Sequence, residues 1–580
     1  MALSRVGTAS SWTGKEYRQY VVIAAILAMP LAFNYLVACI IYHWTYRQSK
    51  RRGMQQVPPE YPAMIPILGS TLPFLWDSAT FVKKATLYAG RVTAVRISLL
   101  VNGIYLFQDP EAVAAMWKHP SLSSPIFVYT VGLRYLFGMP EKAIESYTID
   151  DSGPYRKPHP NSNVAPHNRV DFLTHDSLLR GLTGSAMGPT FKRYQSIVQR
   201  NLDTEGVGEE WKEMPDLFLF FRNHIGKAQL ESLFGPSLLR INPGFVDDLW
   251  AYDEEVKHLA KRFPRFLIPN AYRVRDRLLA QIKNWYQYAR VQFGEDAMDE
   301  NGEWDPFWGS SMNRQRQAML LNIDGQDDDS VASTDLGLIW TSITNVVPST
   351  MMTALHIFKD EHLLSRIRGS IEDTVTHDNE AGFGVAMDKL LSKDLLQSVY
   401  AETLRLYVQS YITRCSPHED VAVGRWWLPR NEVSMVSSYV SHMNTGVWNT
   451  QHGKHPVTSF WPERFLVDSR DDQSGPMRRD LVEAAAATTM NKTRNSKDDE
   501  PHFTLQGLSG AWIPYGGGFG ACPGRLLAKR IILYTCALLV SEFDVKINTR
   551  DFEMDSSGFG LGTQKPEGQI AFAIRKRKAQ

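Results

Sequence analysis

One uncharged stretch stands out when hydrophobic and polar positions are followed along the chain. Residues 21–41 contain no charged side chain over about the 20 residues that a helix needs to cross a membrane. A cleaved signal peptide is the alternative. Its apolar core is usually only about 7 to 15 residues long and is followed by a small-residue cleavage site, which is not clear here. The pattern predicts a transmembrane anchor over residues 21–42, after an N-terminal segment of residues 1–20.

Basic residues and then prolines follow this stretch. Four basic residues lie within residues 47–52, whereas the basic residues upstream are partly offset by a glutamate. The positive-inside rule therefore places the rest of the chain in the cytosol. Four prolines within residues 57–66 fix φ and remove N–H donors. We expect a basic, proline-rich hinge at residues 43–66, ahead of a single catalytic domain over residues 67–580.

The remaining pattern predicts a mainly α domain with a small β region. An Asn-Gly pair at residues 102–103 divides a β-branched and aromatic run at 91–108, as in a hairpin. Amphipathic stretches such as 246–263 and 273–293 predict long helices in the middle of the chain. Short β-like runs follow at residues 421–429, 433–440 and 569–574.

Residues 468–500 depart from this pattern because polar and alanine-rich positions replace the apolar ones. Such a composition offers too little apolar surface to join a core. We expect a mobile surface insertion within the domain.

Composition and charge narrow the classes of function. With 43% hydrophobic and 22% charged residues, the chain is an ordinary globular protein. Sixty-three basic against 62 acidic residues leave a formal charge of +1, so no nucleic-acid partner is expected. The four cysteines are too scattered for a disulfide framework and form no C-x-x-C pair for zinc. Any cysteine chemistry should come from one residue acting alone.

One cysteine lies between a glycine-rich loop and an apolar helical pattern. This segment is WIPYGGGFGACPGRLLA, residues 512–528, with the thiol at Cys522. Glycines allow a backbone to lie flat against a large planar ligand. A helix that starts at Pro523 would stabilise the Cys522 thiolate, the form that binds metals. A buried cysteine that acts as a small hydrophobe is the alternative, but the spacing favours a metal ligand.

The loop resembles the haem-binding signature of the cytochrome P450 family, in the order Tyr515-Gly516-x-Gly518-x-Gly520-x-Cys522-x-Gly524. The resemblance implies the P450 fold, with one large haem domain behind the transmembrane helix, and haem b as cofactor. It implies Cys522 as the axial iron ligand and, around the haem, Tyr515, Gly516, Gly518 and Gly524. Two positions differ from the family, which usually has Phe in place of Tyr515 and often a basic partner for a haem propionate in place of Gly520.

Two upstream motifs also resemble the family, in the expected order. They are Glu402-x-x-Arg405 and Pro462-Glu463-Arg464-Phe465, which imply a buried network of charges. Glu402 and Arg405 lie one helical turn apart and can pair, and Arg464 can join them. This network is expected to be structural. Arg414 stands where the family often places a propionate-binding arginine, and an exposed arginine is the alternative.

Residues 335–358 look like the long helix that crosses the haem in this family. Pro348 cannot donate to the carbonyl of Thr344, so we expect a kink and a free acceptor beside Asn345. Most members carry an acid and a threonine for proton delivery, but Val347 and Pro348 take those positions. Thr344, Asn345 and Ser349 are therefore the candidates for ordering catalytic water.

The spacing of Trp340, Asn345 and Pro348 resembles the branch with sterol 7α- and 12α-hydroxylases and prostacyclin synthase. This branch contains oxygenases and an isomerase. The favoured hypothesis is a monooxygenase that oxidises a sterol, a terpenoid or a related secondary metabolite with O2. The first alternative is an isomerase or dehydratase that needs neither external O2 nor NADPH, and the second is a haem-binding sensor without turnover. The monooxygenase is favoured because the matched hydroxylases also lack the acid and the threonine.

The resemblance also implies partners and a location. Electrons would come from NADPH–cytochrome P450 reductase, which the family docks near the positions of Arg525, Lys529 and Arg530. The substrate would be a lipophilic small molecule. The anchor implies a single-pass membrane protein of the endoplasmic reticulum, with the catalytic domain in the cytosol.

Overall fold

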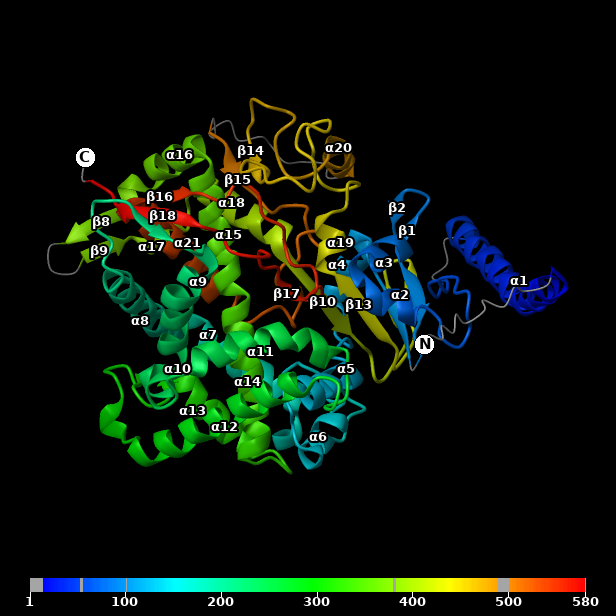
Figure 1. Ribbon diagram of the computed structural model, residues 1–580, viewed down its shortest axis with the longest axis horizontal. Coiled ribbons are helices and arrows are strands. Elements are labelled where there is room, and N and C mark those ends of the chain that lie inside the picture. The colour runs from blue at the N-terminus through cyan, green and yellow to red at the C-terminus, as the bar shows by residue number, and fades with distance from the viewer. Residues whose placement is uncertain (1–13, 53–55, 101, 379–381, 489–499, 579–580) are drawn as a thin grey trace, which may run out of the picture.

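The computed structural model describes residues 14–52, 56–100, 102–378, 382–488 and 500–578. Helices form most of the body, a region of strands lies beside them, and α1 projects from the side of the strands (Figure 1). This arrangement confirms the prediction of a mainly α domain with a small β region.

The helices account for the long amphipathic stretches of the sequence. In the first half they are α1 (Gly14–Arg52), α2 (Thr71–Trp76), α3 (Ser78–Ala85), α4 (Pro110–Lys118), α5 (Ile126–Val131), α6 (Glu141–Thr148), α7 (Val170–Leu182), α8 (Gly184–Asp203), α9 (Leu217–Phe221), α10 (Lys227–Ile241), α11 (Phe245–Ala260) and α12 (Pro269–Gln292). In the second half they are α13 (Ser311–Leu321), α14 (Asp328–Thr344), α15 (Val346–Lys359), α16 (Glu361–Ile371), α17 (Met387–Leu390), α18 (Asp394–Tyr407), α19 (Ser438–His442), α20 (Arg479–Thr488) and α21 (Arg525–Glu542). The predicted helices at 246–263 and 273–293 are confirmed as α11 and α12.

The largest sheet has the order β17-β10-β13-β4-β3. Its strands are β3 (Val95–Ser98), β4 (Gly103–Leu106), β10 (Val408–Arg414), β13 (Val433–Ser437) and β17 (Leu561–Thr563). The predicted hairpin is confirmed, since β3 and β4 are antiparallel with Ser98 opposite Gly103. The second sheet has the order β16-β18-β5, formed by β16 (Phe543–Ile547), β18 (Phe572–Lys576) and β5 (Lys212–Met214).

Five two-stranded units complete the β structure. They are β1 (Leu87–Tyr88) with β2 (Arg91–Val92), β6 (Trp304–Asp305) with β7 (Gly309–Ser310), β8 (Val375–Asp378) with β9 (Gly382–Val385), β11 (Val421–Val423) with β12 (Trp426–Leu428), and β14 (Leu466–Val467) with β15 (His502–Phe503). The predicted strands at 421–429 are the β11–β12 hairpin.

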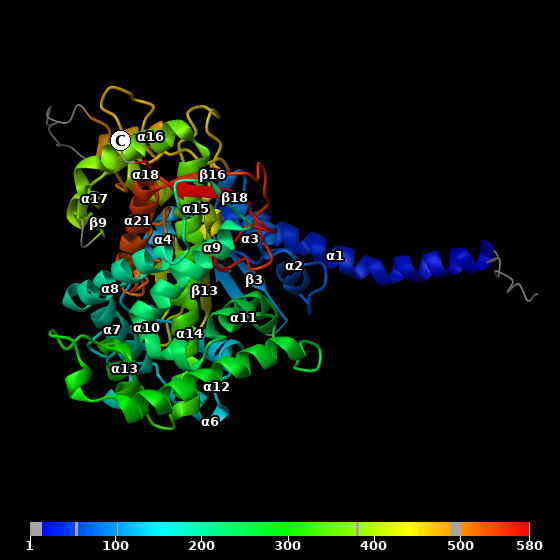
Figure 2. The same ribbon diagram turned by 60° about the vertical axis from the view of Figure 1, so that its left-hand side comes forward.

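The predicted anchor lies within α1, which extends away from the body as a single long helix, as Figure 2 shows. Among the described residues it is the one helix long and apolar enough to cross a membrane, over Arg18–Gln48, judged by length and composition. The helix continues to Arg52, beyond the predicted end of the anchor. Of the N-terminal segment and the hinge, residues 1–13 and 53–55 lie outside the described residues.

The end of α1 packs against the body. Tyr42 and Tyr46 are buried. The Tyr46 ring stacks on Tyr88 at a centroid distance of 4.1 Å and meets Trp426 edge-on at 5.8 Å. Four aromatic rings, those of Tyr42, Tyr46, Tyr88 and Trp426, therefore hold this part of α1 to the β region.

The segment 468–500 also differs in part from the predicted insertion. It lies between β14 and β15, which pair, and contains α20. The Asn449 side chain donates to the carbonyls of Gln473 at 2.7 Å and Gly475 at 2.8 Å, so the beginning of the segment is held to the body. Residues 489–499 lie outside the described part of the chain.

The helix that was expected to kink is divided in two. α14 ends at Thr344, α15 begins at Val346, and Asn345 between them has φ −96° and ψ −42°. Pro348 has no N–H to offer the Thr344 carbonyl four residues before it, which explains the break. The kink is confirmed. α15 is buried along almost its whole length and packs against α21, so the break lies in the centre of the molecule.

Candidate active site

A cavity of about 620 Å³ lies at the helix break. Helices α5, α14, α15 and α21, strands β10 and β17, and the glycine-rich loop contribute to its wall. Most of the lining is apolar, and its members include Val128, Leu133, Phe137, Leu338, Val346, Val408, Ile412 and Leu527. The size and lining are those of a site for a large, mainly apolar ligand.

Cys522 lines this cavity, with its side chain accessible from the cavity. The loop fixes the residue through its backbone, since Cys522 N–H donates to the Tyr515 carbonyl at 2.9 Å. α21 begins at Arg525 with Gly524 as its N-cap, so the prediction of Pro523 as first helical residue is wrong by two positions. Burial raises the pKa of the Cys522 thiol, and the backbone N–H groups of Gly524 and Arg525 with the Arg525 charge only partly oppose this.

Glycines allow two close approaches in the loop. Gly518 has φ +65°, and a Cβ there would lie 2.4 Å from the carbonyl oxygen of Trp117. A Cβ at Gly520 would lie 2.5 Å from the Arg414 guanidinium. Arg414 thus takes the space beside Gly520, and its positive charge lines the cavity. The basic group missing from the loop is supplied by β10.

The other predicted loop residues also lie at the cavity. Tyr515, Gly516 and Gly524 line it, whereas Gly518 supports the loop from behind against Trp117. The Tyr515 hydroxyl lies 2.8 Å from the Tyr400 hydroxyl. This partner explains how a tyrosine is accommodated at a position that is partly buried.

The two upstream motifs form one buried cluster. Arg405 donates to both Glu402 oxygens at 2.7 and 2.8 Å, and Arg464 Nε donates to Glu402 Oε1 at 2.9 Å. All three side chains are 0% exposed. Burial alone would raise the pKa of Glu402, but Arg405 and Arg464 hold it below its usual value. The predicted charge network is confirmed in its geometry.

The arginines are fully engaged by nearby carbonyls as well. Arg405 Nη1 donates to His442 O at 2.9 Å and to Val457 O at 2.7 Å. Arg464 Nη2 donates to Pro456 O at 3.1 Å. The cluster therefore fastens α18 to the chain that leads into the glycine-rich loop.

The three residues predicted to order water lie at or beside the helix break. Asn345 and Ser349 line the cavity, while Thr344 lines a smaller neighbouring pocket and donates to Trp340 O at 2.8 Å. Thr341 and Ser342 also line the cavity.

Both the oxygen and the nitrogen of the Asn345 side-chain amide are hydrogen-bonded within the protein. Its Oδ1 accepts from Thr563 N–H at 2.9 Å, and its Nδ2 donates to Thr341 O at 3.2 Å. Ser349 Oγ lies 3.2 Å from Thr563 Oγ1. Asn345 thus ties β17 to the broken helix, and Thr563 is a site residue that the sequence did not reveal.

Comparison with known proteins identifies this arrangement. A family model described as Cytochrome P450 matches residues 178–572, which is more than half of the chain. The chain belongs to the cytochrome P450 family. A curated relative, "Cytochrome P450 monooxygenase fsoE" of Humicola fuscoatra, is 32% identical over 95% of this chain and 95% of its own length. These findings support a haem monooxygenase, and so an oxidoreductase.

More distant proteins agree with the expected branch and fold. "Cytochrome P450 7A1" of Rattus norvegicus is 21% identical over 57% of this chain and 59% of its own length. Among solved structures, "Retinoic acid bound cyanobacterial CYP120A1" superposes with a TM-score of 0.59 at 17% identity, covering 90% of this chain and all of that one. The P450 fold is confirmed.

The cavity residues fit the haem with thiolate-ligated iron that this family carries. The Cys522 thiol opens into the cavity, and the glycines beside it present no side chain that would keep a planar ring away from the loop. Trp117 Nε1 is buried with no hydrogen-bond partner among the described residues, and the Arg414 guanidinium lies 5.4 Å from its ring. Burial lowers the pKa of Arg414, and Asp171 opposes this. A propionate in the cavity would pair with the Arg414 guanidinium, which lines it.

One of the basic residues expected at the reductase surface turns inward. Lys529 Nζ donates to Gln397 Oε1 at 2.7 Å, and burial lowers its pKa. Arg525 donates to the Cys522 carbonyl at 3.0 Å. The three charges therefore do not form one open patch.

Proposed function

We propose that this P450 enzyme oxidises a lipophilic sterol, terpenoid or related secondary metabolite, with Cys522 as the axial ligand of the haem iron. The single observation that carries the proposal is the Cys522 thiol facing an apolar cavity at the start of α21. When bound, haem with an axial thiolate supplies the activation of O2. The names of the fungal relatives favour the monooxygenase over an isomerase or a sensor.

The remaining residues have roles around this centre. Arg414 holds a propionate through charge-assisted hydrogen bonds. The hydroxyl groups of Ser349 and Thr563 lie close together on the cavity wall at the helix break and hold water there. Asn345 positions Thr563 and does not itself move a proton. Thr344 remains a candidate for ordering water only in the smaller neighbouring pocket, which it lines.

The apolar wall selects the substrate class. Val128, Leu133 and Phe137, in and after α5, line the cavity together with Leu338 of α14 and Val346 of α15. Such a lining binds hydrocarbon by removing it from water and offers few partners to a charged molecule.

The electron donor is NADPH–cytochrome P450 reductase, and the chain is a single-pass protein of the endoplasmic reticulum with its catalytic domain in the cytosol. The apolar α1 and the basic residues at 47–52 support this orientation. The domain begins near residue 67, as the sequence predicts.

The test is the absorption spectrum of the reduced, carbon-monoxide-bound protein. We expect a red-shifted Soret band that Cys522→Ser abolishes and Cys536→Ala, a buried thiol outside the cavity wall, retains. A band that survives Cys522→Ser would overturn the assignment of the ligand. Incorporation of labelled O2 into a lipophilic product, coupled to NADPH consumption, tests the reaction; product formed without either would instead establish the isomerase.

A further inference from the structure

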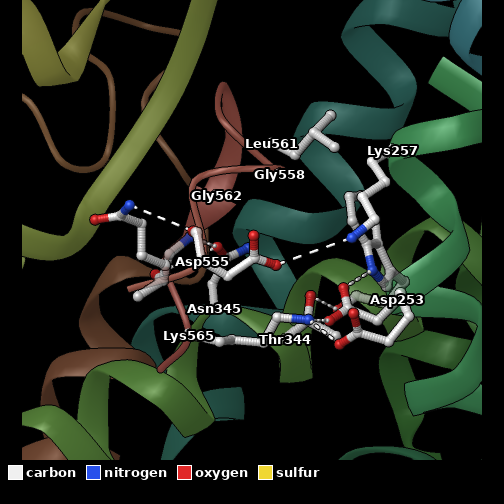
Figure 3. Close-up of a pocket in the computed structure, with 13 residues that line it drawn as sticks. Asp253, Lys257, Thr344, Asn345, Asp555, Gly558, Leu561, Gly562 and Lys565 are labelled. Carbon is white, nitrogen blue, oxygen red and sulfur yellow. Dashed lines mark hydrogen bonds and ion pairs between the residues drawn. The ribbon is translucent and has the colours of Figure 1, made fainter. Parts of the chain in front are cut away.

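A small polar pocket lies against β17 (Figure 3). Asn345 and Thr563 line both this pocket and the haem cavity. Its volume is about 50 Å³, room for roughly three or four water molecules. α11, the end of α14 and residues 555–565 provide its wall. The two spaces therefore meet at one pair of polar residues.

Ion pairs fasten the outer side of this pocket. Lys565 Nζ lies 2.6 Å from Asp253 Oδ2 and 2.6 Å from Glu254 Oε1. Lys257 Nζ donates to Ser557 Oγ at 2.8 Å and lies 4.0 Å from Asp555 Oδ2. All of these contacts join α11 to the C-terminal turn. We call this group of charged residues, Asp253, Glu254, Lys257, Asp555 and Lys565, the ionic clasp.

The clasp is held at its inner end by α14. Trp340 Nε1 donates to Asp253 Oδ1 at 2.7 Å, and the Asp253 side chain is only 9% exposed. Glu254 is 57% exposed. The group thus runs from the surface inward toward the helix break.

Glycine residues form part of the pocket wall behind the ionic clasp, so there the wall consists of backbone without side chains. Gly560 has φ +88° and Gly562 has φ +155°, conformations that L side chains rarely adopt. A Cβ at Gly562 would lie 2.2 Å from Asn345 Oδ1. The backbone at this point therefore presses directly on Asn345, with no side chain filling the space between.

We propose that the ionic clasp is a gate for water and other small polar molecules between the solvent and the haem cavity. The charged lining excludes an apolar substrate, since opening the clasp for hydrocarbon would leave the charges without water or a partner. Water passes because it can solvate each charge as the pair separates. Asn345, Thr563 and Ser349 then receive it at the helix break. The gate goes beyond the proposed function, which concerns the apolar side of the same cavity.

The test measures entry into the haem-loaded, full-length ferric protein without turnover. Stopped-flow absorbance follows the binding of imidazole as the small polar probe and clotrimazole as the large apolar probe. Lys565→Met keeps the length of the side chain but removes its charge. We expect the imidazole association rate to rise about tenfold, the rate equivalent of one charge-assisted hydrogen bond, and the clotrimazole rate to stay unchanged.

The matched control is Lys283→Met, which breaks a Lys283–Asp329 pair of the same 2.6 Å length between α12 and α14. It should leave both rates unchanged. Should Lys565→Met not fold, Glu254→Gln at the exposed end carries the test, with a rise of about threefold. An unchanged imidazole rate in the folded clasp variants, or equal acceleration of both probes, would overturn the gate. Neither result bears on the substrate class, because the probes bind without reaction.

Discussion

Removing the carboxylate of Glu402 should cost the protein both stability and haem. In Glu402→Gln the side chain keeps its shape, but Arg405 and Arg464 lose their counter-charge in a place where all three side chains are 0% exposed. Breaking a buried ion pair by removing one partner costs roughly 3 to 5 kcal/mol. Two arginines share this partner, so we expect the upper part of that range.

The expected loss of unfolding free energy can be converted into a change in melting temperature. An unfolding entropy of about 2.1 cal/mol/K per residue gives about 1 kcal/mol/K for a domain of this length. The apparent Tm should therefore fall by about 4 to 5 °C. Because the cluster fastens α18 to the chain before the glycine-rich loop, haem occupancy at purification should fall as well.

Differential scanning calorimetry and the ratio of Soret to protein absorbance measure both effects. Glu463→Gln is the control next to the cluster, since Glu463 pairs with Arg366 and the two side chains are 32% and 37% exposed. An exposed pair contributes at most about 1 kcal/mol, or about 1 °C here. If Glu402→Gln behaved like this control, with full haem and a Tm within about 1 °C of the original, the structural role of the cluster would be refuted.

Three further outcomes follow from the geometry. Gly520→Arg should weaken haem retention in transfer to apomyoglobin, because its Cβ would lie 2.5 Å from Arg414, and the added Arg414→Ala should restore it; a single variant that holds haem normally would contradict this. Asn345→Ala removes the acceptor of Thr563 N–H, so hydrogen exchange at Thr563 should accelerate by about tenfold, and unchanged exchange would refute the tie. The pKa of Glu402 is lowered in the folded state, so its contribution is fully present above the unfolded value near 4.5 and is lost as the pH falls through the folded pKa. The stability difference from Glu402→Gln should therefore shrink only in acid, and a constant difference down to about pH 2 would contradict this assignment.

Local features of the sequence predicted much of the fold and the centre of the site. Glu402 and Arg405 are separated by one helical turn, so their pairing follows from spacing alone. The hairpin at residues 95–106 and the break beside Asn345 also depend on neighbours within a few positions. Such signals need no knowledge of tertiary packing.

The sequence did not predict features that depend on contacts between distant segments. The contact between Asn345 and Thr563 spans 218 positions, and nothing near either residue indicates the other. Trp117 meets Arg414 only because β10 and the glycine-rich loop converge beside α4. The place of Thr344 could have been derived, since Leu338, Thr341, Ser342, Asn345 and Ser349 repeat at helical spacing and define the cavity face without it.

The aromatic packing of Tyr42 and Tyr46 makes this stretch of α1 part of the folded body. A shortened chain that lacks all of α1 would expose Tyr88 and Trp426 and create an apolar patch that favours aggregation. One that starts just before Tyr42 would keep these rings covered and remain better dispersed. Tyr42 and Tyr46 hold this end of α1 against β1 and β12, so we expect it to move together with the body.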